Sequence, residues 1–261
     1  SGLAIGLTCC MLIILYTKDE VSYDRFHKNA DNIYRLTYRF TNLADSSSHQ
    51  IGSTNFSAGL GFQREIPGIA AVVHLKQFDA LIRKENTSFS ESVQLVDPNF
   101  FSVFTFPLME GNAASALQNE NSVVITSEMA KKYFGSTDVI GKTLQIDYNG
   151  EGFQTFIVSA VAKETPQNSS ISFTFLLHIN HFKKMRKIDG EDWMSGYVNT
   201  FLVLEPNTPA ATVQSKFATV FDKHAGATLK FLSEKFNVKA KIDYSLQPFT
   251  AIHLSTEVGA D

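Results

Sequence analysis

The first sixteen residues constrain this chain more than any other stretch. The apolar run from Leu3 to Tyr16 contains no charge and no proline, and Lys18, Asp19 and Glu20 end it abruptly. A helix that crosses a lipid bilayer needs about 20 apolar residues. A run of fourteen residues rises only about 21 Å as a helix, so this run is too short to cross a bilayer by itself.

Three interpretations of the run remain open. The first is a signal-peptide core, although no basic segment precedes the run and no clear cleavage site follows it. The second is a helix buried in a globular core. The third, which we favour, is the outer end of a membrane helix, because Tyr16, Tyr23 and Phe26 follow where aromatic side chains meet lipid headgroups.

Composition indicates a folded body with no charge bias. The chain has 261 residues, of which 44% are hydrophobic, and a net charge of -3, which argues against a nucleic-acid partner. Its two cysteines, Cys9 and Cys10, are adjacent and lie in the apolar run. The rest of the chain therefore has to be stable through packing without disulfides.

The hydrophobic periodicity predicts an α+β fold. Residues 33–40 alternate as a half-buried strand, and residues 139–146 and 153–162 flank an Asn-Gly turn typical of a hairpin. Helices are expected from a Thr54 cap to Glu65, after Thr126, and after Thr208-Pro209. Strands and helices do not alternate regularly, which argues against a doubly wound sheet.

Residues with catalytic or ligand-binding chemistry form no convincing site. His178 and His181 lack further metal ligands, and Glu191 and Asp192 are best interpreted as a solvated turn. The lysine-rich segment 183–187 is best interpreted as a solvated helix face, and Gly59 and Gly61 as close packing rather than a dinucleotide loop. We therefore predict no catalytic residue, no metal and no cofactor, and no enzyme.

Several short motifs, taken in order, carry a resemblance to a known family. The chain resembles the periplasmic core domain of MacB-like, FtsX-type ABC transporter permeases. The most specific part is Glu20-x-Ser22-Tyr23-Asp24-x-Phe26-His27 followed by Ile33-Tyr34-Arg35. The later matches are Asp97-Pro98-x-Phe100-Phe101, Phe106-Pro107-Leu108, Gly111-Asn112, Ser122-Val123-Val124-Ile125-Thr126, Ala130-Lys131-Lys132-x-Phe134-Gly135, Ile140-Gly141-Lys142-x-Leu144, Leu246-Gln247-Pro248-Phe249 and Ile252-His253-Leu254.

The resemblance implies a two-lobed α+β domain outside the bacterial inner membrane. A porter-like lobe would be built from residues 18–87 and 166–261, and a β-rich lobe from residues 88–165 would be inserted in it, with residues 1–17 ending a transmembrane helix. The implied partners are a cytoplasmic ABC ATPase, a second permease half or subunit, the membrane, and a periplasmic partner or cargo. The implied function couples ATP hydrolysis to conformational change and export.

Such coupling requires a stiff connection between membrane and body. We expect one uninterrupted helix from Leu3 to about His27, which contains no proline and no glycine after Gly6. The candidate coupling residues are Tyr23, Asp24, Arg25, Phe26 and His27. Their alternative interpretation is ordinary core and surface, and the alternative function of the chain is a membrane-anchored, ligand-binding sensor domain.

Overall fold

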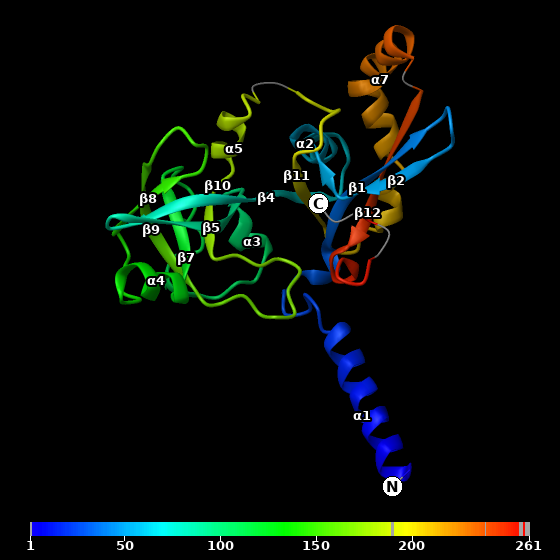
Figure 1. Cartoon of the computed structure of the whole chain (residues 1–261). Helices are drawn as coiled ribbons and strands as arrows, with labels where there is room; N and C mark the ends of the chain where they lie inside the picture. Colours follow the sequence, from blue (N-terminus) through cyan, green and yellow to red (C-terminus); the bar gives the residue numbers. More distant parts are fainter. Residues whose placement is uncertain (1, 189–190, 238, 256–257, 259–261) are drawn as a thin grey trace.

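A folded body with a single projecting helix makes up this protein. The computed structural model describes all residues except 1, 189–190, 238, 256–257 and 259–261. Figure 1 shows helix α1 (Gly2–Glu20) standing away from a body in which the remaining elements are gathered. The α+β class predicted from the sequence is confirmed.

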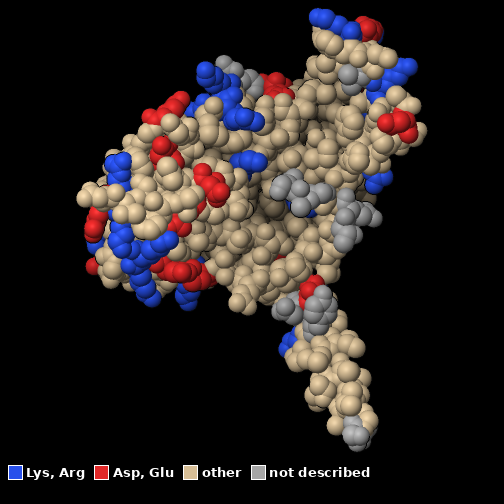
Figure 2. Space-filling model, viewed as in Figure 1, with Lys and Arg blue, Asp and Glu red and all other residues tan. Residues whose placement is uncertain are grey.

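Helix α1 exposes the apolar run of the sequence. Ile5 is 66% exposed and Ile13 is 64% exposed, so the interpretation as a buried core helix is wrong. Figure 2 shows no charged side chain along the helix until the end that joins the body. No helix in the described part of the chain reaches the length and apolarity that crossing a membrane requires.

The helix ends earlier than we expected. Residues 21–27 form turns instead of continuing the helix to His27, and Asp24 adopts a left-handed backbone with φ 61°. The amide of Val21 still bonds the carbonyl of Thr17, whereas the amide of Asp24 bonds Asn168 in a distant loop. A tertiary contact therefore replaces the helical hydrogen bond, which the local sequence does not reveal.

One mixed sheet runs through the body. Its main path has the order β12-β1-β11-β4-β5-β10-β7-β9-β6, with β2 beside β1, β3 beside β11, and β8 beside β4 and β9. The strands are β1 (Ile33–Asn42), β2 (Ser48–Ile51), β3 (Ser53–Thr54), β4 (Ile69–Lys84), β5 (Thr87–Val96), β6 (Leu108–Gly111), β7 (Ser122–Thr126), β8 (Thr143–Asp147), β9 (Gln154–Ala162), β10 (Phe175–His178), β11 (Val198–Leu204) and β12 (Ala240–Pro248).

Helices cover the sheet at several places. Helix α2 packs on β4 and β11, α7 packs on β12, and α4 packs on β7 and β9. The helices of the body are α2 (Phe56–Glu65), α3 (Phe100–Val103), α4 (Ser127–Phe134), α5 (Asn180–Met185), α6 (Ala210–Gln214) and α7 (Phe217–Phe236), with 3-10 turns η1 (Ala30–Asn32) and η2 (Phe249–Ala251).

Strand β4 connects the two ends of the sheet. Its first half pairs with β11, from Ile69 to Leu75, and its second half pairs with β5 and β8. In Figure 1 it crosses between the group of β8, β9 and β7 and the group of β1, β12 and α7. Because a paired strand is stiff along its length, β4 links these groups without a flexible linker.

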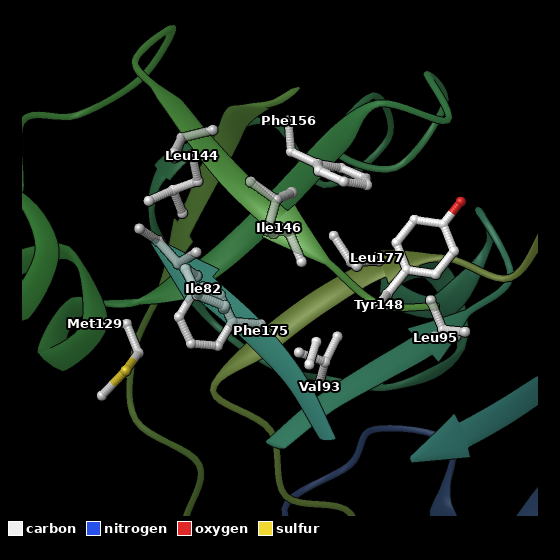
Figure 3. Packing of buried hydrophobic residues seen from close by; sticks show 14 of the residues in the cluster. Ile82, Val93, Leu95, Met129, Leu144, Ile146, Tyr148, Phe156, Phe175 and Leu177 are labelled. Carbon is white, nitrogen blue, oxygen red and sulfur yellow. The ribbon is translucent and has the colours of Figure 1, made fainter. Parts of the chain in front are cut away.

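The hydrophobic core comprises three clusters. One lies among the strands β4, β5, β7, β8, β9 and β10, and it includes Ile82, Phe156, Phe175 and Leu177 (Figure 3). A second, rich in phenylalanine, includes Phe100, Phe104, Phe106, Phe173 and Phe249. The third lies between α2, α7 and the strands β1, β11 and β12.

Several local predictions are confirmed and one cap is corrected. The hydroxyl of Thr126 accepts the hydrogen bond that begins α4, and Gly135 ends that helix with φ 72°. The hairpin around Asn149-Gly150 forms between β8 and β9. The cap of α2 is Asn55, not Thr54, because the hydroxyl of Thr54 is buried against Thr200.

Close packing explains the glycines of α2. A Cβ on Gly59 would lie 2.7 Å from the Cγ2 atom of Thr200 and 2.9 Å from a methyl group of Val72. We expect Gly59→Ala to lower the free energy of unfolding by about 1–3 kcal/mol, although alanine favours helices. Denaturant unfolding of the purified chain measures this difference.

Gly226→Ala is the matched control for that change. The nearest atom to a Cβ at this position of α7 would be 3.9 Å away. This substitution should raise the stability by up to about 1 kcal/mol through helix propensity. Equal effects at the two positions would contradict the packing explanation.

Candidate functional site

The candidate site is the junction where α1 enters the body. Residues 21–32 form it, and they contact three segments that are distant in the sequence: residues 104–106, residues 168–170, and His253 near the end of the chain. Four of the five predicted coupling residues lie in these contacts. The structure thus brings Tyr23, Asp24, Phe26 and His27 together at the junction.

Asp24 is the most deeply buried charged residue of the junction. Its side chain is 0% exposed, its Oδ1 atom accepts a hydrogen bond of 2.8 Å from the amide of Ser170, and its own amide donates to the carbonyl of Asn168 over 2.9 Å. Burial raises the pKa of this carboxyl, and the hydrogen bonds from Ser170 and Ser169 offset only part of that rise. Its Oδ2 atom has no partner among the described residues.

The left-handed backbone of Asp24 explains the residue type at this position. Aspartate and asparagine tolerate this conformation better than most residues do, because their short side chains bond locally. Here the side chain bonds the amide of Ser170 instead of a neighbour in sequence. Asp24 therefore both turns the chain at the end of α1 and fastens it to the loop between β9 and β10.

His27 is held in an aromatic enclosure. Its ring is 3% exposed and its centroid lies 5.0–5.5 Å from those of Phe104, Phe106 and Phe249. Its Nδ1 atom accepts a 2.8 Å hydrogen bond from the amide of Thr105, which places the proton of the neutral ring on Nε2. Burial lowers the pKa of His27 to about 4.

The outer side of the junction joins the two ends of the chain. The ring of Tyr23 stacks on the imidazole of His253, with centroids 3.4 Å apart and planes only 4° apart. The Nε2 atom of the same histidine lies 3.2 Å from a carboxylate oxygen of Glu20. The last turn of α1 is therefore attached to the segment that follows β12.

Phe26 and Arg25 differ in their surroundings. Phe26 is half-buried and its ring meets the edge of Phe106 at 5.8 Å, so it belongs to the phenylalanine-rich cluster. Arg25 is exposed, and its Nε atom donates to the carbonyl of Val21 within the same turn. Arg25 thus makes no described hydrogen bond to the body, whereas the other four candidates contact it through ring packing or hydrogen bonds.

The other candidates from the sequence have structural roles. His181 lies between the hydroxyl of Tyr148 and the carbonyl of Glu120, and His178 accepts the amide of Asn180. Glu191 pairs with Arg64, and Asp192 accepts amides of its own turn. Within the described residues no cluster of three metal-ligating side chains occurs.

Sequence reasoning missed the residues that receive the junction. Thr105, Asn168, Ser170 and His253 contact it from other parts of the chain, and none of them stands out by periodicity. His253 lies within one of the motifs that carried the family resemblance, which was the only available signal. The other three lie in loops whose sequences resemble those of ordinary turns.

The chain is similar in sequence or fold to several known proteins. The profile of the MacB-like periplasmic core domain matches residues 1–220. A permease domain from Porphyromonas gingivalis superimposes with a TM-score of 0.70 at 20% identity, covering 85% of this chain and 92% of that one.

Two further solved structures are similar in fold. The periplasmic region of MacB from Actinobacillus actinomycetemcomitans gives a TM-score of 0.53 at 16% identity, covering 89% of this chain and 95% of that one. The extracellular domain of the ABC-type transporter YknZ from Gram-positive bacteria gives 0.50 at 17% identity, covering 83% and 100%. No protein of curated function matches the sequence.

The buried His27 predicts a specific dependence of stability on pH. Because its pKa is about 4 in the folded chain and about 6.5 when unfolded, the folded state binds fewer protons between these values. The contribution of His27 to the free energy of unfolding is therefore fully present above pH 6.5 and is lost as the pH falls toward 4. The shift corresponds to at most about 3 kcal/mol.

His27→Gln is the variant that isolates this effect. Glutamine does not titrate and retains an oxygen that can accept the amide of Thr105. The difference in unfolding free energy between parent and variant should shrink as the pH falls from 6.5 to 4. A difference that stays constant over that range would show that His27 is not the titrating group.

Proposed function

This chain belongs to the family of MacB-like periplasmic core domains, and on that premise we propose that it couples ATP hydrolysis in the cytoplasm to movement and export outside the inner membrane. Membership of the family makes it the extracytoplasmic domain of an ABC transporter permease. The proposed partners are the ABC ATPase, a second permease half or subunit, and a periplasmic partner or cargo.

The observation that carries this proposal is the clamped junction. A displacement of α1 reaches the body only if the connection does not bend, because a flexible linker would absorb the motion. Asp24 and His27 fasten the turn to loops 168–170 and 104–106, and Glu20 and Tyr23 fasten it to His253. The connection would thus be stiff through buried contacts, in place of the uninterrupted helix expected from the sequence.

The junction also suggests where a displacement would go. Residues 104–106 precede β6, and residues 168–170 precede β10, so both loops lead into the end of the sheet that contains β7 and β9. His253 follows η2 beside β12, at the opposite end. We propose that a movement of α1 changes the relation between these two ends.

The division into lobes belongs to the same proposal. We retain a porter-like lobe of residues 18–87 and 166–261, and an inserted β-rich lobe of residues 88–165. Strand β4 lies in the first range and pairs with β8 of the second, so it would join the two lobes. The transmembrane role of residues 1–17 is part of this proposal as well.

A sensor domain is the rival function. A ligand pocket usually has a volume of about 300–1,000 Å³ and is lined by apolar groups with a few convergent polar ones. The pocket between Arg35 and Asn199 has a volume of about 120 Å³. The larger hollows, of about 350–450 Å³, are more open to solvent and do not enclose a small ligand. A sensor therefore receives less support from the described residues than the coupling role does.

Phe26→Ser tests the coupling role. The change removes ring contacts between the junction and the phenylalanine-rich cluster, so α1 should move without carrying the body along. In the full permease assembled with its ATPase, ATP hydrolysis should persist. The change in hydrogen exchange of this domain between ATP-bound and nucleotide-free states should become smaller, because local opening in the body would depend less on the position of α1.

Phe89→Ser is the matched control. Phe89 is 38% exposed on β5 and is not part of the junction. Its replacement should leave the nucleotide-dependent exchange unchanged. Full nucleotide response and full export in the Phe26 variant would contradict the coupling role.

A further inference from the structure

Helix α7 carries a histidine that meets a carboxylate at each of its two ring nitrogens. The Nε2 atom of His224 lies 2.5 Å from a carboxylate oxygen of Glu65, the last residue of α2. Its Nδ1 atom lies 3.2 Å from a carboxylate oxygen of Glu191, in the segment between α5 and β11. The ring therefore lies between two segments that are distant in the sequence.

This geometry indicates the protonation state of the ring. A neutral imidazole has one N–H donor and one nitrogen with a lone pair, whereas an imidazolium donates from both nitrogens. With a single proton, the nitrogen that lacks it would present its lone pair to a carboxylate oxygen, which is repulsive. The positions of Glu65 and Glu191 therefore favour the doubly protonated, positively charged form of His224.

Other cations keep the two carboxylates ionised in mildly acid solution. Lys223 donates to Glu65 over 2.8 Å, and this bond is the main cause that lowers the pKa of Glu65. Arg64 donates to Glu191 over 2.9 Å, and this bond is the main cause that lowers the pKa of Glu191. The charged groups that contact the ring or its carboxylates thus come from α2, α7 and the segment before β11, and their signs alternate along the row Lys223, Glu65, His224, Glu191 and Arg64.

The only tryptophan of the chain is stacked on this histidine. The ring centroids of Trp193 and His224 are 4.7 Å apart and their planes differ by 14°. Because the face of an indole attracts a cation, the stack also favours the protonated ring. The Nε1 atom of Trp193 donates over 3.3 Å to Oε2 of Glu191, the same oxygen that lies beside His224.

The tryptophan reaches this place because α2 has a glycine opposite it. A Cβ atom on Gly61 would lie 2.5 Å from the Cη2 atom of Trp193. Trp193 is 5% exposed and belongs to the third core cluster, together with Phe62 of α2. The segment that carries Trp193 is therefore packed against both helices, and His224 is the point where its charge meets α7.

We propose that His224 is a proton-operated latch, which holds residues 191–193 against α2 and α7 when its ring is charged and loosens them when the ring is neutral. A neutral ring keeps its shorter bond to Glu65, so the carboxylate of Glu191 then faces a lone pair. The bond from Arg64 remains, but it is exposed and contributes little by itself.

The latch responds to pH in the opposite direction from His27. Because folding favours the charged form of His224, its contribution to stability is present in mildly acid solution and is lost as the pH rises. This contribution requires ionised Glu65 and Glu191, whose lowered pKa values extend the range of the latch to lower pH. The latch shares no residue with the junction, so it is tested without the permease or its ATPase.

The intrinsic fluorescence of Trp193 reports the latch without a label. An imidazolium stacked on an indole quenches its emission, and a neutral imidazole quenches it much less. In the full chain in detergent, emission should therefore rise in one step as the pH increases from about 5 to 8, the range in which histidine changes its charge. His224→Gln should abolish this step, whereas His49→Gln, which replaces an exposed histidine of β2, should leave it unchanged.

Glu65→Gln tests the carboxylate that stays bonded to the ring. Loss of this partner should move the midpoint of the emission step to lower pH by about half a unit, as the energy of a partly exposed ion pair predicts. Glu234→Gln is the matched control, because Glu234 is an exposed residue of α7 that pairs with Lys230. This control should leave the midpoint unchanged.

Access of acrylamide to Trp193 distinguishes a latch from simple titration. In the parent chain, quenching by acrylamide should increase as the pH rises through the emission step. In Glu191→Gln the emission step should persist, because His224 retains Glu65. The increase in acrylamide quenching should disappear in this variant, because a neutral amide is not repelled by the neutral ring.

Three results would overturn the proposal, with circular dichroism verifying the fold of each variant. The first is a parent emission that does not change with pH, and the second is an emission step that persists in His224→Gln. Either result would show that His224 does not carry the titrating charge. The third is acrylamide quenching that stays constant with pH in the parent, which would show that residues 191–193 are held equally in both protonation states.

Discussion

The hydrogen bonds that fasten Asp24 to Asn168 and Ser170 determine how the rest of the structure is connected. They turn the chain at the end of α1, hold a carboxylate in the interior, and attach the first residues of the body to a loop almost 150 positions later. Burying a carboxylate is unfavourable unless hydrogen bonds satisfy it. We propose that these bonds hold α1 in one orientation relative to the body.

The remaining contacts of the junction complete this fixation from other sides. The phenylalanine-rich cluster encloses His27, and the stacked ring of His253 binds the outer face of Tyr23. Together these contacts join both ends of the chain and two loops of the sheet within one small volume. Strand β4 pairs with β11 at one end of the sheet and with β8 at the other, so it connects the two ends.

The sequence predicted the parts that depend on neighbouring residues. Alternation in residues 33–40, the Asn149-Gly150 turn, and the Thr126 cap follow from local chemistry, and all three are present. The motif around Tyr23 and Phe26 lies at the junction, where four of the five candidate coupling residues contact other segments, and their coupling role stays a prediction. The end of α1 could not be predicted, because the bond from Asp24 to Asn168 depends on a loop that the fold brings there. The surroundings of His224 are equally invisible in sequence, since Glu65 and Glu191 come from distant segments.

A direct measurement of the stiffness of the junction tests the central claim. One spin label is placed on Cys10 of α1 after Cys9→Ser, and a second on Lys230→Cys of α7, in the full chain in lipid nanodiscs. Pulsed dipolar spectroscopy then gives the distribution of distances between them. A stiff junction predicts one narrow distribution that broadens in Asp24→Ala. A distribution in the parent as broad as that of the variant would contradict the account, because α1 would then move independently of the body.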